Sequence, residues 1–124
     1  YYPDGKPFGS RREMDNPVML DWVKRQFIQA ELTLSVCTGA LILAKAGLLE
    51  NLEATTHFMA LDTLKQLAPN TRVSGNKRFV DNGKIILSEG VSAGIDMAFY
   101  TVAKLQGPEV ARETARYMQY DHWK

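Results

Sequence analysis

The sequence predicts an α/β layer fold within one domain. Segments that alternate like strands are interleaved with segments whose apolar residues recur at helical spacing. Glycine and proline residues lie at the boundaries between several of these segments. The chain has 124 residues, of which 45% are hydrophobic and 23% charged. That length and composition are typical of a single globular domain with its own core.

Charge and cysteine content narrow the classes of function. Fifteen basic residues against 14 acidic ones give a net charge of +1, which argues against a nucleic-acid partner. The longest apolar run is too short for a membrane span and no leader is evident, so we expect no membrane partner. The single cysteine, Cys37, cannot form an internal disulfide, and we expect a reducing, cytoplasmic location. Cys37 and the two histidines are far apart in the sequence and do not form a recognisable set of metal ligands, so we expect no metal site. We also expect no other cofactor.

The beginning of the chain predicts a loop followed by an amphipathic helix. Residues 1–10 contain two prolines and two glycines, a composition typical of a loop. Asn16 followed by Pro17 is a helix start, because the side chain can cap the first turn and proline fixes φ there. Apolar residues at helical spacing extend this predicted helix to about Glu31.

A strand that leads directly into a buried helix is predicted next. Residues 32–36 alternate as a strand does, and residues 40–46 are apolar apart from one lysine. A helix that is apolar nearly all round is usually an interior one. Gly47 ends it as a left-handed cap would. Cys37 therefore stands where a strand turns into an interior helix.

The second half predicts short strands and further helices. The expected strands are residues 54–56, 71–74, 77–80 and 85–87. The expected helices are residues 58–67, 93–106 and 108–119. Asn82-Gly83 is a strong signal for a hairpin between the last two strands. Four aromatic residues on helical faces are expected to be core or contact residues: Trp22, Phe99, Tyr100 and Tyr117.

Cys37 has a physical reason to be a nucleophile. Amides of the first helical turn have no partner within the helix, and they favour the thiolate over the thiol. Gly39 keeps the turn uncrowded, and the Thr38 amide is placed to hold an oxyanion, as the residue after a nucleophile does. The alternative is that Cys37 is a buried packing residue, which is the commoner role of free cysteines.

Two further side chains are candidates for the same site. His57 follows a predicted strand, so it would leave the sheet at the same edge as Cys37 and could exchange a proton there. The alternative for His57 is a half-buried cap of the next helix. Arg11 could hold an anionic group, and the alternative is an ordinary solvated position. His122, in the terminal tail, is expected to be a surface or docking residue.

The order of these motifs resembles the ThiJ/PfpI superfamily, which has a class I glutamine amidotransferase-like fold. The motifs are Ser35-Val36-Cys37-Thr38-Gly39-Ala40, Ala46-Gly47-Leu48-Leu49 and Ala54-Thr55-Thr56-His57. Two later stretches look like its isocyanide hydratase-like branch: Gly90-Val91-Ser92-Ala93-Gly94-Ile95-Asp96 and Tyr117-Met118-Gln119-Tyr120-Asp121. The resemblance runs from about Pro3 to the end. It implies a flavodoxin-like, three-layer α/β/α sandwich.

The resemblance also implies roles for individual residues. Cys37 matches the nucleophilic cysteine, and His57 matches a histidine near it in deglycase/chaperone-like members. Thr38 stands where protease-like members have histidine, so peptidase activity is disfavoured. Gly5 matches the end of the family's Pro-Gly-Gly loop, whose amide helps to form the oxyanion hole. Asp4 departs from the first glycine of that loop.

Members of the superfamily carry strands and helices ahead of the Pro-Gly-Gly loop, and residues 1–124 hold no counterpart of them. One of those elements carries an acidic residue that hydrogen-bonds the cysteine. We therefore expect residues 1–124 to be a single, partial domain with an exposed sheet edge and an apolar face. Such a surface favours pairing with another chain, and we expect a homodimer.

The function implied by the resemblance is cysteine-dependent hydration or hydrolysis of a small electrophilic carbon, such as an isocyanide or a carbonyl adduct. In that scheme Cys37 attacks, the amides of Thr38 and Gly5 hold negative charge, and His57 or the Thr38 hydroxyl moves protons. Two other hypotheses stay open. One is a non-catalytic domain that senses a small molecule, of the kind fused to transcription regulators. The other is an inactive, truncated remnant.

Overall fold

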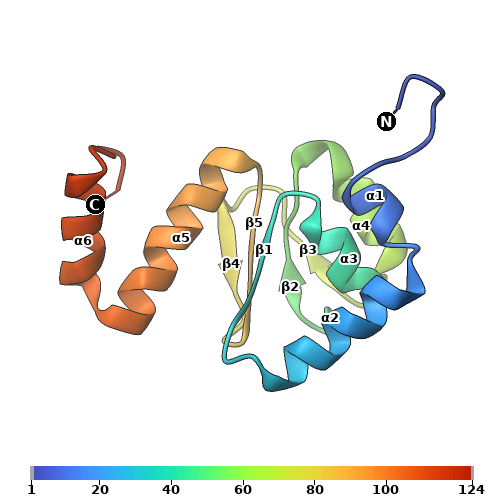
Figure 1. The fold of residues 1–124 in the computed structure, drawn as a ribbon, viewed down its shortest axis with the longest axis horizontal. Coiled ribbons are helices and arrows are strands. Elements are labelled where there is room, and N and C mark those ends of the chain that lie inside the picture. The colour runs from blue at the N-terminus through green and yellow to red at the C-terminus, as the bar shows by residue number, and fades with distance from the viewer. Residues whose placement is uncertain (1, 124) are drawn as a thin grey trace.

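A small mixed sheet lies in the middle of the computed structural model, which describes residues 2–123 (Figure 1). Its order is β1 (Thr33–Val36), β5 (Ile85–Ser88) and β4 (Phe79–Asp81). β1 runs parallel to β5, and β4 is antiparallel to β5. A second, two-stranded parallel sheet is formed by β2 (Glu53–Ala54) and β3 (Arg72–Val73).

Helices cover both faces of the central sheet, which confirms the predicted layer fold. α5 packs on β4 and β5, with α6 outside it, and α3 packs on the opposite face against β1, α1, α2 and α4. Within residues 2–123, no helix has both the length and the hydropathy needed to cross a bilayer. The bounds are α1 Ser10–Glu13, α2 Pro17–Gln29, α3 Gly39–Lys45, α4 Leu61–Leu67, α5 Val91–Gln106 and α6 Pro108–Tyr117.

The predicted helices and strands are present, with ends slightly shifted. Asn16 caps α2, because its side-chain oxygen accepts from the amides of the first turn. Gly47 has φ 76°, as its predicted left-handed role requires. The helix expected from residue 58 begins as a 3-10 turn, η1 (Phe58–Ala60). The short helix α1 is not among the predicted elements, because the sequence pattern places Ser10 in a loop and gives Arg11 no helical role.

The predictions for the four aromatic residues are only partly correct. Phe99 is buried and Tyr100 is half-buried, but Tyr117 is 92% exposed. The reason is that α6 packs against α5 through small residues, the buried Ala111 and Ala115, so the large ring is left in solvent. Trp22 is also half exposed, on the surface of α2.

The close approach of α5 to β1 depends on Gly94. A Cβ atom built at Gly94 would lie 2.8 Å from Cγ1 of Val36, which is shorter than real contacts allow. On the other face of the sheet, a Cβ atom at Gly39 would lie 3.6 Å from Cβ of Ser35, an ordinary contact. Val36 and Ser35 point to opposite faces, so the two glycines report on the two helical layers separately.

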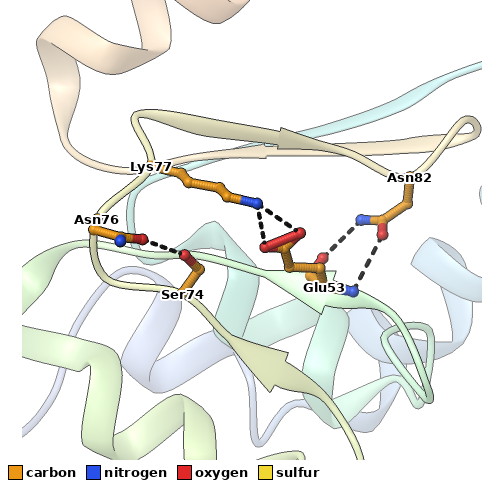
Figure 2. A network of polar contacts seen from close by, with 5 residues as sticks. All are labelled: Glu53, Ser74, Asn76, Lys77 and Asn82. Carbon is orange, nitrogen blue, oxygen red and sulfur yellow. Dashed lines mark hydrogen bonds and ion pairs between the residues drawn. The ribbon is translucent and has the colours of Figure 1, made fainter.

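A polar network joins the two sheets (Figure 2). The Asn82 side chain donates to the Glu53 carbonyl at 2.7 Å and accepts from the Glu53 amide at 3.1 Å, so it pairs with β2 as a neighbouring strand would. Lys77 binds the Glu53 carboxylate at 2.8 and 3.1 Å, while Ser74 donates to Asn76 in the connection from β3 to β4. The hydrogen bond from Lys77 holds the pKa of Glu53 below its ordinary value. This network fixes the start of β2 against the β4–β5 turn.

A second network ties α5 to the same turn through Asp81. Partial burial raises the pKa of Asp81, but hydrogen bonds from Tyr100, Lys104 and the Gly83 amide outweigh it. The pKa of Asp81 is therefore held below its ordinary value of 3.8. The hydrogen bond between Tyr100 and Asp81 also raises the pKa of Tyr100. Asp81 thus contributes to stability as a carboxylate.

We predict that Gly94→Ala destabilises the fold by about 1 kcal/mol or more, because α5 or Val36 must shift to admit the methyl group. Gly39→Ala is the matched control. Its methyl group meets only an ordinary contact, so the free energy of unfolding should stay at or above that of the unsubstituted chain. Chemical denaturation monitored by circular dichroism measures both. Equal stability of the two variants would contradict the close packing of α5.

We predict an acid dependence of stability that originates at Asp81. A carboxyl whose pKa is lower in the folded than in the unfolded state stabilises the fold at pH values above its pKa in the unfolded chain. That stabilisation is lost as pH falls below about 4 toward the folded value. Asp81→Asn should make the decrease in unfolding free energy over this pH range smaller. Tyr100→Phe should have the same effect in part. Tyr117→Phe, which changes only an exposed ring, should leave the decrease as it is. An unchanged slope in Asp81→Asn would contradict the assignment.

Candidate functional site

Cys37 occupies a strained turn between β1 and α3. Its φ is 59°, a left-handed conformation that residues with a side chain seldom adopt. β1 ends at Val36 and α3 begins at Gly39, so only Cys37 and Thr38 connect them. The turn places a half-buried thiol at the end of the strand. This is the geometry of a nucleophile elbow.

Three hydrogen bonds hold the Cys37 backbone in that conformation. Its amide donates to the carbonyl of Ser88, the last residue of β5, at 3.2 Å, and to that of Glu89, just after β5, at 2.9 Å. Its carbonyl accepts from the hydroxyl of Thr56 at 2.7 Å. Thr56 is buried and follows β2, so both sheets contribute to the turn. A strained backbone persists only when its surroundings fix it in this way.

A cavity of about 400 Å³ opens beside the thiol. Four of the residues predicted to form the site line it, together with Met59: Arg11, Cys37, Thr38 and His57. They come from distant parts of the chain, namely α1, the turn after β1 and the segment after β2. The structure thus brings together residues that are far apart in sequence.

Thr38 is held by a contact from α1. The Ser10 hydroxyl donates to the Thr38 hydroxyl oxygen at 2.5 Å. The Thr38 amide, by contrast, donates to no acceptor within residues 2–123. A backbone N–H beside the thiol that is not engaged in the fold is the kind of donor an oxyanion requires.

Of the two ring nitrogens of His57, Nδ1 has a hydrogen-bond partner among residues 2–123 and Nε2 has none there. The Met59 amide donates to Nδ1 at 3.2 Å, so Nδ1 is an acceptor and the neutral ring carries its proton on Nε2. The ring lies 4.5 Å from the Phe58 ring between centroids, and a Cβ atom at Gly90 would lie 3.4 Å from its Cδ2. His57 therefore caps η1, as the alternative considered from sequence expected, and also lines the cavity beside Cys37.

Two predicted residues, Gly5 and Gly39, do not line this cavity. The Gly5 amide donates to the Tyr2 carbonyl at 2.8 Å and is thus engaged within its own loop. Gly39 is the first residue of α3 and lines a different groove, along β1. His122 is exposed in the tail. Across residues 2–123, no group of three histidine, cysteine or acidic residues is arranged to hold a metal ion.

Sequence reasoning missed the residues that support the site. Ser10 gave no signal, because an isolated serine at the end of a loop is common. Met59 was counted only as part of helical spacing. Thr56 was recognised as the end of a strand, but its hydrogen bond to Cys37 joins residues 19 positions apart and depends on how the two sheets meet.

Comparison of sequences relates the chain to one family. A profile of the DJ-1/PfpI family matches residues 5–104. Isonitrile hydratase of Pseudomonas putida is 35% identical over 107 residues, which cover 86% of this chain and 46% of the hydratase. The HTH-type transcriptional regulator CdhR of Pseudomonas aeruginosa is 30% identical over 95 residues, which cover 77% of this chain and 28% of the regulator. The chain thus spans less than half the length of these two relatives.

Solved structures give the same relation. A ThiJ/PfpI family protein from Pseudomonas syringae superposes with a TM-score of 0.83 at 29% identity, covering 91% of this chain and 46% of that protein. Drosophila melanogaster DJ-1beta superposes with a TM-score of 0.74 at 23% identity, covering 91% of this chain and 61% of DJ-1beta. These structures confirm the flavodoxin-like fold. The strained cysteine turn, the fold around it and the matches over most of the chain lead to one conclusion: the chain belongs to the DJ-1/PfpI family.

Proposed function

We propose that this chain carries a cysteine-dependent site that hydrates or hydrolyses a small electrophilic carbon, with isocyanides as the first substrate class. The observation that supports it most is the left-handed Cys37 beside a cavity that Thr38 and His57 also line. The similarity to isonitrile hydratase points to the substrate class. A reducing cytoplasm would keep the thiol free for this chemistry.

The proposed reaction adds water to the terminal carbon of an isocyanide in two steps. The Cys37 sulfur first bonds to that carbon, and a proton is delivered to the same carbon, which gives a thioimidate. Water then adds to the same carbon, the carbon–sulfur bond breaks, and an N-substituted formamide leaves. One molecule of isocyanide and one of water are consumed, and the thiol is regenerated. No oxidant, reductant or metal is needed.

Each lining residue has a proposed part in these steps. The Thr38 amide would hold negative charge as the water adduct forms, because it donates to no acceptor among the described residues 2–123. His57 would exchange a proton through Nε2, since Nδ1 is held by the Met59 amide. Arg11 would bind a polar or anionic group of the substrate. Gly5 would contribute to the oxyanion hole only if its loop releases the bond to Tyr2.

A second candidate function is a small-molecule sensor without turnover. Two helix-turn-helix regulators support it, CdhR at 30% identity and GlxA of Rhizobium meliloti at 34% identity over 80 residues. The matches to the hydratase and to CdhR cover 86% and 77% of this chain, so they overlap over most of it, and similarity alone does not separate sensing from catalysis. A measurement of turnover separates sensing from catalysis, because a sensor binds the ligand and leaves it unchanged.

We predict that Cys37→Ser and Cys37→Ala each lower formamide production from an aryl isocyanide by about a thousandfold or more, since no other thiol is present. Product is measured by chromatography, and thermal unfolding shows that the variants stay folded. Activity retained in both variants would contradict the nucleophile. Isocyanide that binds to the unsubstituted chain without any turnover would favour the sensor instead.

We predict that Arg11→Gln raises KM for an isocyanide bearing a carboxylate by about tenfold, through loss of a charge-assisted hydrogen bond, with a small effect on kcat. Arg12→Gln is the matched control, because Arg12 is on the same helix but does not line the cavity. Initial rates over a range of substrate concentrations separate KM from kcat. Equal KM values for the two variants would contradict the role of Arg11.

A further inference from the structure

Two stretches singled out in the sequence, residues 90–96 and 117–121, do not line the cavity beside Cys37. The structure joins them, because the Tyr120 hydroxyl donates to Oδ1 of Asp96 at 2.9 Å. Asp96 belongs to α5, and Tyr120 follows α6 in the tail. Tyr120 lies outside residues 5–104, which are the part of the chain that the DJ-1/PfpI profile matches. The contact therefore involves a segment beyond the matched core of the family.

The tail turns back toward α5 at the end of α6. Gln119 has φ 54°, a left-handed conformation that residues other than glycine seldom adopt. The Tyr120 amide donates to the Ala115 carbonyl at 2.8 Å, which closes the turn at the helix end. The half-buried Tyr120 ring stacks on Phe99 of α5, with 5.2 Å between the ring centroids. The turn and the ring contact together fix where the Tyr120 hydroxyl lies.

The other carboxylate oxygen of Asp96 binds Arg78, which precedes β4. Both Nε and Nη2 of Arg78 lie 2.7 Å from Oδ2 of Asp96. Nη2 also donates to the Ser92 hydroxyl oxygen at 3.4 Å, on the same helix. Only 16% of the Asp96 side chain is exposed, so solvent screens this ion pair less than it screens a fully exposed one. One carboxylate thus links the tail, α5 and the start of β4.

Arg78 also holds the short connection between β5 and α5. The connection consists of Glu89 and Gly90, because β5 ends at Ser88 and α5 begins at Val91. The Arg78 carbonyl accepts from the Glu89 amide at 2.9 Å, while the Arg78 side chain binds α5. A single residue therefore holds the connection at its β5 end and at its α5 end.

This connection contacts two residues of the candidate site. The Glu89 carbonyl accepts from the Cys37 amide at 2.9 Å, which is one of the bonds that hold the left-handed turn. Gly90 lies against His57, since a Cβ atom at Gly90 would be 3.4 Å from Cδ2 of the ring. A shift of the connection would move the thiol relative to the histidine. Misplacement of reacting groups by about 1 Å can lower a rate by about a hundredfold.

We infer that Tyr120 is a positioning residue for the proposed site and acts through the Asp96 carboxylate and Arg78. Its hydroxyl keeps the Asp96 carboxylate in place for Arg78. Arg78 in turn keeps the Glu89 carbonyl where it accepts from the Cys37 amide. This inference rests on the reaction proposed above, in which Cys37 is the nucleophile. Tyr120 does not line the cavity, so it is not a catalytic residue.

The test variant is Tyr120→Phe, which removes only the hydroxyl, and Tyr100→Phe is its matched control. The Tyr100 hydroxyl also donates to an aspartate, Asp81, which is the last residue of β4 and lies at the opposite end of that strand from Arg78. Both variants lose a tyrosine hydroxyl that binds an aspartate, so a general loss of stability would act in both. Only Tyr120→Phe should disturb the position of the Cys37 turn.

Amide hydrogen exchange measured by NMR reports on this turn without any substrate. In Tyr120→Phe we expect the Cys37 amide to exchange about fivefold faster, while the Thr33 amide, at the start of β1, changes by less than about twofold. Tyr100→Phe should leave the ratio of these two exchange rates unchanged. In an Asp96→Ala background, Tyr120→Phe should have no further effect on the ratio, because the carboxylate through which it acts is then absent.

Turnover of an aryl isocyanide is measured on the same variants. In Tyr120→Phe we expect kcat to fall about fivefold with KM within about twofold of the parent, since the residues that line the cavity are unchanged. Three results would overturn the inference: an unchanged ratio of exchange rates in Tyr120→Phe, an equal change in Tyr100→Phe, or a further change when Tyr120→Phe is added to Asp96→Ala. An unchanged kcat would do the same where the parent turns over substrate. A parent without turnover would contradict the proposed reaction instead, and the exchange rates alone would then decide the role of Tyr120.

Discussion

The left-handed backbone of Cys37 is the constraint on which the rest of the structure depends. A side chain in this region costs about 1–3 kcal/mol unless its surroundings compensate. Here the compensation comes from carbonyls at the end of β5 and from the Thr56 hydroxyl after β2. In this turn Cys37 and Thr38 both line the cavity of the candidate site. The chemistry proposed for this chain is possible only while those distant contacts persist.

The second sheet matters because it delivers Thr56 and His57 to this turn. β2 is only two residues long, too short to fix its own position by strand pairing. Two residues hold Glu53, the first residue of β2: Lys77 from the β3–β4 connection and Asn82 from the β4–β5 turn. A polar contact at one end of the sheet therefore sets the position of a histidine at the other end. Loss of these contacts would therefore disturb both the fold and the proposed site.

Both helical layers approach β1 closely, but neither covers its free edge. Gly94 allows α5 to reach Val36, and Gly39 begins α3 on the other side. Between them the strand leaves apolar side chains beside a groove that also holds the buried Ser35 hydroxyl, for which residues 2–123 provide no hydrogen-bond partner.

The sequence by itself determined the interleaved helices and strands, the hairpin at Asn82-Gly83, the cap at Asn16 and the position of Cys37 between a strand and a helix. Those features follow from local periodicity and from the conformational preferences of single residues. Only the tertiary structure decided that Arg11, Thr38 and His57 share a cavity with Cys37 while Gly5 does not, and that Tyr117 is exposed. These outcomes depend on contacts between segments far apart in the chain, which no local pattern specifies.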